Sequence, residues 1–206
     1  ECRGSVSSFD PETGMLTVHA ANQGVHLAKM TLCGQLGLAP DKVRVLCGDI
    51  GGSFGLKIGT SREDLACAAA SRDLGRPVKF IEDRREHLMF SGQAREESMI
   101  AEAAVTNEGQ VLGLKVDMTV DTGAYPGMGS MISGLIESML PGPYKMEALG
   151  FTFSATVTNK AQYVAYRGPW AAETFTRERL LDLVAHEVGI EPLDLRLRNV
   201  VTRGEP

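Results

Sequence analysis

The chain has 206 residues, 43% of them hydrophobic, which is enough apolar material to bury a core in one large domain or two small ones. Its 21 basic and 26 acidic residues give a net charge of -5, and no basic run is longer than Arg84-Arg85. This balance argues against nucleic acid or an anionic membrane as a partner and favours a small-molecule ligand.

The four cysteines are widely spaced and form no Cys-x-x-Cys pair: Cys2, Cys33, Cys47 and Cys67. They therefore encode neither a zinc motif nor an iron–sulfur motif. Two disulfides are an alternative, but a chain of this size rarely needs them, so we expect reduced thiols and a cytoplasmic protein. No signal segment or apolar run of about 18 residues is present. Because the chain lacks a starting Met and ends abruptly after Gly204-Glu205, we expect it to be a piece of a longer protein.

In chain order, the first half predicts short strands alternating with helices. Residues 5–9 and 15–20 predict a β-hairpin, and Leu27, Met30 and Leu36 predict a helix over 27–36 that ends at Gly37. A buried strand is expected at 43–46.

Ser61, followed three residues later by Asp64, resembles a capping box. It predicts a helix with an apolar stripe of Leu65, Ala66, Ala69 and Ala70 that stops at Gly75 and Pro77. A strand over 78–81 follows. The charged segment 82–86 is typical of a solvated turn and the start of a helix.

The second half predicts another hairpin, 99–105 with 111–121, whose second strand alternates strictly and therefore buries one face. The stretch 123–143 holds five Gly, three Pro and three Met, so it is either a functional loop or a connection that contains a short helix. A strand at 151–157, a helix at 171–188 and a short helix from Pro192 complete the chain. Together these elements predict an α+β fold of mixed sheets with packed helices.

Between the strand at 43–46 and the Ser61 helix lies the loop Gly51-Gly52-Ser53-Phe54-Gly55-Leu56-Lys57. Its glycines would let backbone N–H groups approach an electron-rich ligand closely. The loop matches neither a P-loop nor a GxGxxG motif, and a plain turn is the ordinary alternative. Phe54 is either a core plug or a wall of a ligand pocket.

A second loop, Tyr166-Arg167-Gly168-Pro169-Trp170, also precedes a helix. Its ordinary interpretation is a helix start with Arg167 in a surface ion pair and Trp170 as a core anchor. Gln23 follows the strand at 15–20, where an isolated amide is usually a turn residue. The histidines show no metal-ligand spacing, and no catalytic triad order stands out.

A series of short motifs resembles, in order and spacing, the large subunit of the molybdenum hydroxylases, the xanthine dehydrogenase, aldehyde oxidase and carbon monoxide dehydrogenase family. The resemblance covers about residues 5 to 200 and points to the first of that subunit's two molybdopterin cofactor-binding domains. The motifs are Gln23, Leu36-Gly37-Leu38, Lys42-Val43-Arg44-Val45, Gly51 to Lys57, Leu74 to Lys79, Asp121-Thr122-Gly123-Ala124-Tyr125, Ala165-Tyr166-Arg167-Gly168 and Asp194 to Asn199.

By position, Gln23 resembles the glutamine that approaches the apical oxygen on molybdenum. The segment Gly51, Gly52, Ser53, Phe54 and Gly55 resembles the one whose backbone lies against the pterin. Tyr166, Arg167 and Gly168 resemble a second loop facing the metal. The resemblance implies a molybdenum-bound molybdopterin, in a dinucleotide form, in the parent enzyme. No residue of this chain is expected to ligate the metal directly.

The same resemblance implies which parts of the enzyme this chain lacks and which partners the parent has. The second cofactor domain, which supplies the general-base glutamate, is absent, so we name no catalytic residue and expect the isolated piece to be inactive and to hold no cofactor. The parent would work with the rest of the large subunit, with iron–sulfur and FAD subunits or domains, and with a small-molecule substrate.

Three departures bear on the substrate. Gly168 stands where carbon monoxide dehydrogenases carry a cysteine, which argues against copper-bridged chemistry. Ile58 and Leu135 are apolar where purine-hydroxylating relatives carry a glutamate and an arginine. We therefore expect oxidation of an aldehyde or an N-heteroaromatic compound, with water as the oxygen source. The alternatives are a non-catalytic structural or assembly relative and a generic nucleotide-binding module.

Overall fold

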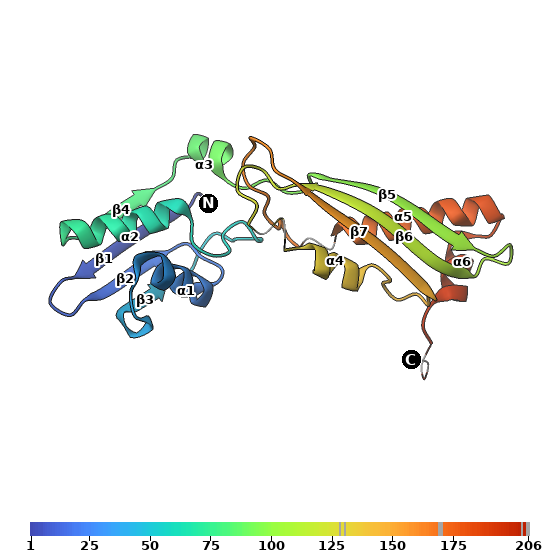
Figure 1. The fold of residues 1–206 in the computed structure, drawn as a ribbon, viewed down its shortest axis with the longest axis horizontal. Coiled ribbons are helices and arrows are strands. Elements are labelled where there is room, and N and C mark those ends of the chain that lie inside the picture. Colours follow the sequence, from blue (N-terminus) through green and yellow to red (C-terminus); the bar gives the residue numbers. More distant parts are fainter. Residues whose placement is uncertain (128, 130, 169–170, 203, 205–206) are drawn as a thin grey trace. The chain divides into compact units, whose positions relative to one another are not determined.

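The structure is a computed structural model that describes residues 1–127, 129, 131–168, 171–202 and 204. The chain divides into two compact units, Glu1–Gly92 and Gln93–Pro206. Figure 1 labels their elements, which combine helices with mixed sheets. This arrangement confirms the expected α+β class.

The first unit carries the strands β1 (Gly4–Asp10), β2 (Met15–Ala20), β3 (Val43–Leu46) and β4 (Val78–Ile81), and the helices α1 (Val25–Leu36), α2 (Arg62–Leu74) and α3 (Arg84–Phe90), with a 3₁₀ turn at Pro40–Lys42. The strands lie in the order β3-β2-β1-β4. The predicted hairpin is confirmed, because β1 and β2 pair antiparallel, while β2 and β3 pair in parallel across α1.

Helices α1 and α2 cover the same face of this sheet, since both contribute to one core cluster: Leu16, Val18, Ala20, Leu32, Val43 and Ala68. The α1 helix is confirmed, but of the three apolar residues that indicated it only Leu36 packs against the core. Ala28 and Leu32, one turn apart, face the sheet, whereas Leu27 is 48% and Met30 is 71% exposed. The small Ala28 side chain lets the helix lie close to the strands, so Leu27 and Met30 are left outside.

Helix α2 starts as predicted. The Ser61 hydroxyl accepts a hydrogen bond from the Asp64 N–H at 3.0 Å, and the Asp64 carboxylate accepts one from the Ser61 N–H at 2.9 Å. The predicted stripe is only partly correct, because Ala66 is exposed and the fully buried positions are Cys67, Ala68 and Ser71. The Ser71 hydroxyl accepts from the Phe9 N–H, so a polar contact ties this helix to β1.

The charged segment 82–86 begins α3 as expected, but Glu82 is buried rather than solvated. Its carboxylate lies 2.7 Å from His87 Nδ1 and accepts from the Arg3 N–H at 3.0 Å. Burial opposes its charge, but the hydrogen bonds from Arg3 and His87 outweigh burial and lower the Glu82 pKa. The sequence pattern alone could not indicate that Glu82 is buried, because its partner Arg3 lies far away along the chain.

The second unit carries the strands β5 (Glu97–Val105), β6 (Val111–Asp121) and β7 (Ala148–Thr156), and the helices α4 (Ser133–Met139), α5 (Ala171–Val188) and α6 (Pro192–Asn199). The strands lie in the order β5-β6-β7. Strands β5 and β6 form the predicted hairpin, and β7 runs parallel to β6. The short helix α4 within 123–143 confirms one of the two readings of that stretch.

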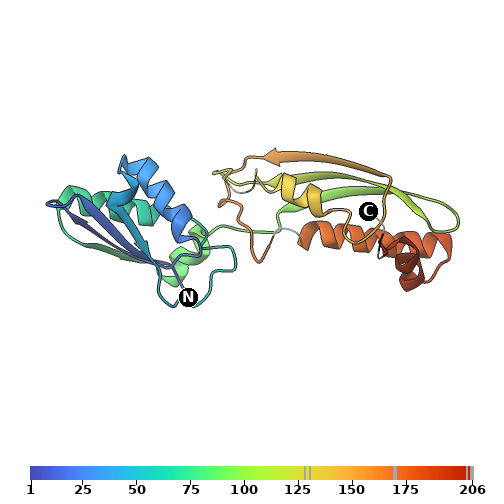
Figure 2. The ribbon, with the colours of Figure 1, turned by 90° about the horizontal axis from the view of Figure 1, so that it is seen from below.

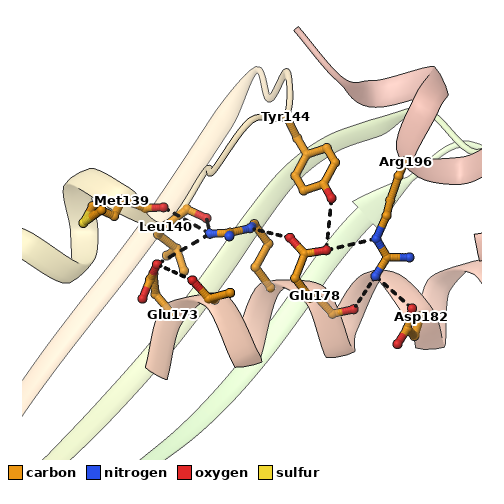
Figure 3. Close-up of polar contacts among 9 residues, drawn as sticks. Met139, Leu140, Tyr144, Glu173, Glu178, Asp182 and Arg196 are labelled. Atoms are coloured by element: carbon orange, nitrogen blue, oxygen red, sulfur yellow. Dashed lines mark hydrogen bonds and ion pairs between the residues drawn. The ribbon is translucent and has the colours of Figure 1, made fainter. Parts of the chain in front are cut away.

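The β6 residues Leu114, Val116, Met118 and Val120 form the buried face, and α4 and α5 cover it. Figure 2 shows α5 running along this sheet. Arg177 of α5 donates to the carbonyl oxygens of Met139 and Leu140, which Figure 3 labels. This buried contact fixes the end of α4 to α5. Among the described residues, no helix is long and apolar enough to cross a membrane.

The motif Asp121-Thr122-Gly123 forms a turn that ties the end of β6 to residues 158–162. Asp121 accepts hydrogen bonds from the Gly123 N–H at 2.9 Å and the Thr158 hydroxyl at 2.7 Å, and pairs with Lys160 at 2.8 Å. Gly123 has φ 70, and a Cβ there would lie 2.2 Å from the Ala161 carbonyl oxygen. Only glycine therefore fits this position.

The hydrogen bonds from Lys160 and Thr158 lower the pKa of Asp121 to about 2. Because the folded pKa lies below the unfolded value of about 3.9, the ionised carboxylate stabilises the fold fully above about pH 4. That contribution is lost as the pH falls toward about 2. We expect the stability difference between the native chain and Asp121→Asn to shrink over this range in urea unfolding experiments. A difference that stays constant from about pH 6 to pH 2 would contradict this role.

Candidate functional site

Gln23 lies between β2 and α1, where the chain turns from strand to helix. Its backbone N–H donates to the Lys57 carbonyl oxygen at 2.9 Å. The neighbouring Asn22 is buried; its side-chain oxygen accepts from the Gly24 N–H, and its amide donates to the Gly59 carbonyl. These contacts bring Gln23 to the loop that begins at Gly51, although the two are far apart in the sequence.

The Gln23 side chain is oriented by that loop. Its Oε1 accepts from the Gly55 N–H at 2.9 Å and from the Ser53 hydroxyl. Because a backbone N–H can only donate, the atom facing Gly55 must be the amide oxygen. Gln23 is exposed, and its Nε2 has no hydrogen-bond acceptor among the described residues. The Gln23 Nε2 amide group is therefore available as an uncharged hydrogen-bond donor to a ligand.

The loop itself adopts backbone conformations that require glycine. Gly52 has φ 100 and Gly55 has φ 98, and a Cβ on Gly52 would lie 2.7 Å from the Phe54 ring. Phe54 also has a positive φ of 56, and its side chain is 49% exposed, so it is not buried in the core. Strained backbone of this kind gathers at ligand clamps and active sites.

Lys57 closes the base of this loop. Its side chain is buried, its N–H donates to the Ser53 hydroxyl at 3.1 Å, and its ammonium donates to Glu1 at 3.1 Å. The Gly51 N–H and then the Lys57 ammonium lower the pKa of the Glu1 carboxyl. A buried lysine paired with Glu1 thus lies under the segment expected to meet an electron-rich ligand.

The second predicted loop belongs to the other unit and is held by a residue that the sequence did not single out. Arg95 donates to the carbonyl oxygens of Tyr166 at 2.7 Å and Gly168 at 3.2 Å. Arg167 and Gly168 have φ 56 and φ 89. Pro169 and Trp170, including the expected core role of Trp170, lie outside the described residues. Arg95 has no motif spacing that could have pointed to it.

A cluster of Glu82, His87 and Ser91 holds the residue types of a hydrolytic triad but not its geometry. Both the Glu82 carboxylate and the Ser91 hydroxyl contact the same ring atom, His87 Nδ1, at 2.7 and 3.1 Å. A relay needs the serine and the acid on opposite ring nitrogens. Within the described part of the chain, no group of three or more His, Cys, Asp or Glu side chains could hold a metal ion, and the four cysteines are free thiols.

Residues 1–200 match the model of a protein family described as the molybdopterin cofactor-binding domain. The chain belongs to this family. The 6-hydroxypseudooxynicotine dehydrogenase complex subunit gamma of Paenarthrobacter nicotinovorans is 38% identical over 98% of this chain. The carbon monoxide dehydrogenase large chain of Hydrogenophaga pseudoflava is 32% identical over 98%. This chain spans 26% of each of these relatives, about a quarter of their length.

Solved structures agree with the family. Quinoline 2-oxidoreductase from Pseudomonas putida 86 matches 98% of this chain with a TM-score of 0.90 and 30% identity, and the match covers 26% of that protein. Aldehyde oxidoreductase from Desulfovibrio gigas matches 100% of this chain with a TM-score of 0.91 and 25% identity, covering 23% of that protein. These findings confirm the resemblance to the molybdenum hydroxylase large subunit and the predicted fold.

Proposed function

We propose that this chain is the first molybdopterin-binding domain of a longer large subunit, and that it forms one part of the cofactor cradle of a molybdenum-dependent hydroxylase. The observation that carries the proposal is Gln23, whose oxygen is occupied by Ser53 and Gly55 while its amide N–H₂ group stays available. Family membership over residues 1–200 supports the same cofactor.

The residues around Gln23 and the Gly51 to Gly55 loop fit a molybdopterin cofactor. A ligand rich in oxygen and sulfur needs donors at close range, and the backbone N–H groups of Gly52 and Ser53 have no acceptor among the described residues. Gly52 is partly exposed and has no Cβ, so the backbone there can approach a flat ring system closely. The buried Lys57 ammonium is paired with Glu1 at 3.1 Å, so it fixes the base of the loop without adding net charge.

When bound, the molybdenum cofactor would supply the oxygen transfer and accept two electrons, with water as the source of oxygen. Gln23 would donate from Nε2 to an oxygen ligand and, being neutral, would orient that ligand without cancelling its charge. The loop Gly51 to Gly55 would hold the pterin through the available backbone N–H groups of Gly52 and Ser53. Tyr166, Arg167 and Gly168 would form the second loop. Such donors are fixed before the reaction, so they need no reorganisation during it.

The substrate that we propose is an N-heteroaromatic compound or an aldehyde. Relatives include a nicotine 6-hydroxylase large subunit, a nicotinate dehydrogenase large molybdopterin subunit and an aldehyde oxidoreductase. The apolar Ile58 and Leu135 provide no charged contact for a purine. Gly168 has no thiol to hold copper, although a carbon monoxide dehydrogenase is among the relatives.

We further propose that the isolated chain is inactive. The general-base glutamate would come from the rest of the large subunit, and electrons would leave through iron–sulfur and FAD partners. Relatives are named as the subunit of a complex or as a large chain, which supports a multi-subunit parent.

The test is oxidation by the full-length protein, purified with its partner subunits, of quinoline or benzaldehyde in H₂¹⁸O with a dye as electron acceptor. The product should carry ¹⁸O, whereas xanthine and carbon monoxide should not be oxidised. Turnover in which the new oxygen comes from O₂ would contradict the proposed reaction, and turnover of xanthine alone would contradict the proposed substrate class.

A further inference from the structure

All three described non-glycine residues with positive φ lie in the two predicted cofactor loops or contact one of them. They are Phe54 in the first loop, Arg167 in the second, and Arg95, which contacts the second. Arg95 has φ 69 and lies two residues before β5, outside every motif of the sequence. Non-glycine residues adopt this conformation only where their surroundings impose it, so the strain at Arg95 marks a position fixed by its contacts.

Backbone pairing places Arg95 beside the second loop. The Gln93 N–H donates to the Gln162 carbonyl at 2.9 Å, and the Val164 N–H donates to the Gln93 carbonyl at 2.8 Å. These bonds form an isolated parallel bridge between Gln93 and Tyr163, two residues before Arg95 and three before Tyr166. The planar guanidinium then reaches two carbonyl oxygens of the loop, at 2.7 and 3.2 Å. A fork of fixed N–H groups suits two acceptors at once, whereas an ammonium is a single point charge.

Arg95 lines a surface pocket together with Glu96, Glu97 and Asp121, but no ion pair joins its guanidinium to a carboxylate among the described residues. Its neighbours Glu96 and Glu97 are occupied elsewhere, by Lys160 at 2.8 Å and by the Tyr163 hydroxyl at 2.5 Å. Because the loop carbonyls of Tyr166 and Gly168 are bound to Arg95, they cannot turn toward a ligand. The Gly168 N–H, by contrast, has no acceptor among the described residues.

We propose that Arg95 is a positioning residue: it holds the carbonyl oxygens of the Tyr166–Gly168 loop away from the cofactor and keeps the loop in the left-handed conformation that presents the Gly168 N–H group to it. This inference rests on the proposed function for the identity of the ligand. The clamp itself rests only on geometry within one unit.

The test uses the full-length protein with Arg95→Ala and Arg95→Lys, and with Arg179→Ala as a matched control. Arg179 is an exposed arginine of the same unit for which no hydrogen bond or ion pair is present among the described residues. The first measurement is the rate of trypsin cleavage after Arg167, followed by mass spectrometry. Loss of two charge-assisted hydrogen bonds should raise this rate on the order of tenfold in Arg95→Ala. Arg95→Lys should be intermediate, and Arg179→Ala should match the native protein.

The second measurement is the Mo(V) electron paramagnetic resonance spectrum after dithionite reduction, which should shift in Arg95→Ala and recover partly in Arg95→Lys. Faster cleavage with an unchanged spectrum would overturn the positioning role, since the clamp would then be structural only. Unchanged cleavage in both variants would overturn the clamp. A native protein without molybdenum would instead overturn the proposed function, and the cleavage rates would still decide whether the clamp exists.

Discussion

Replacing Gly52 with alanine should remove most of the bound pterin from the full-length protein. The new Cβ would lie 2.7 Å from the Phe54 ring, at a backbone φ of 100 that side chains rarely adopt. Holding alanine in such a conformation costs about 1–3 kcal/mol, before any movement of the ring is counted. Either the loop changes conformation or Phe54 moves, and both changes displace the N–H groups that face the ligand.

Gly48→Ala is the matched control for this change. Gly48 precedes the same loop, its φ is not positive, and a Cβ there would meet nothing within 4 Å. Pterin is measured by fluorescence after oxidative release, and circular dichroism checks that both variants fold. We expect at least about a tenfold loss for Gly52→Ala, equivalent to about 1.4 kcal/mol. Native pterin content in a folded Gly52→Ala protein would show that this loop does not form the cradle.

Replacing Arg177 with leucine should destabilise the second unit more than any surface change. The Arg177 side chain is 7% exposed; it donates to two carbonyl oxygens at the end of α4, and its Nε donates to Glu178 at 3.0 Å (Figure 3). Glu173, 3.9 Å away and 3% exposed, would be left as a buried charge without a counter-ion. Breaking such a buried pair by removing one partner costs about 3–5 kcal/mol.

The measurement is urea unfolding, with hydrogen exchange to assign the loss to residues 133–188. Arg177→Leu combined with Glu173→Leu should be less destabilising than the sum of the two single changes, because the double variant leaves no unpaired charge. Arg179→Leu, on the same helix but exposed, should change stability by about 0.5 kcal/mol or less. Strict additivity of the two buried changes would contradict the ion-pair account.

Local signals in the sequence were sufficient for most elements. Asp64 and Ser61 form the predicted capping box, and the alternation from Leu114 to Val120 gave the buried face of β6. The faces of α1 and the burial of Glu82 were not predictable in this way. The buried face of α1 depends on which side of the helix meets the sheet, and the burial of Glu82 depends on Arg3. Both are set by contacts between segments that are distant in the sequence.

The candidate site likewise contains residues that the sequence indicated and one that it did not. Glycine spacing pointed to Gly51 to Gly55, and the structure joins that loop to Gln23 through Gly55 and Ser53. Arg95 was missed because an isolated arginine before a strand has no pattern of its own. Motifs that carried the resemblance also have structural roles: Asn199 accepts from the Val111 N–H at 2.8 Å and donates to the Gly109 carbonyl at 2.8 Å, which ties α6 to the β5–β6 hairpin.

The central claim is that Gln23 and its loop bind a molybdopterin cofactor. It is tested most directly by measuring molybdenum and pterin in the full-length protein and in its Gln23→Leu variant. Leucine keeps the size of the side chain but removes the acceptor of the Gly55 N–H and the available donor. We predict about one molybdenum and one pterin per large subunit in the native protein, and a marked loss of both in the variant. A native protein with neither molybdenum nor pterin would contradict the account and favour a non-catalytic assembly relative.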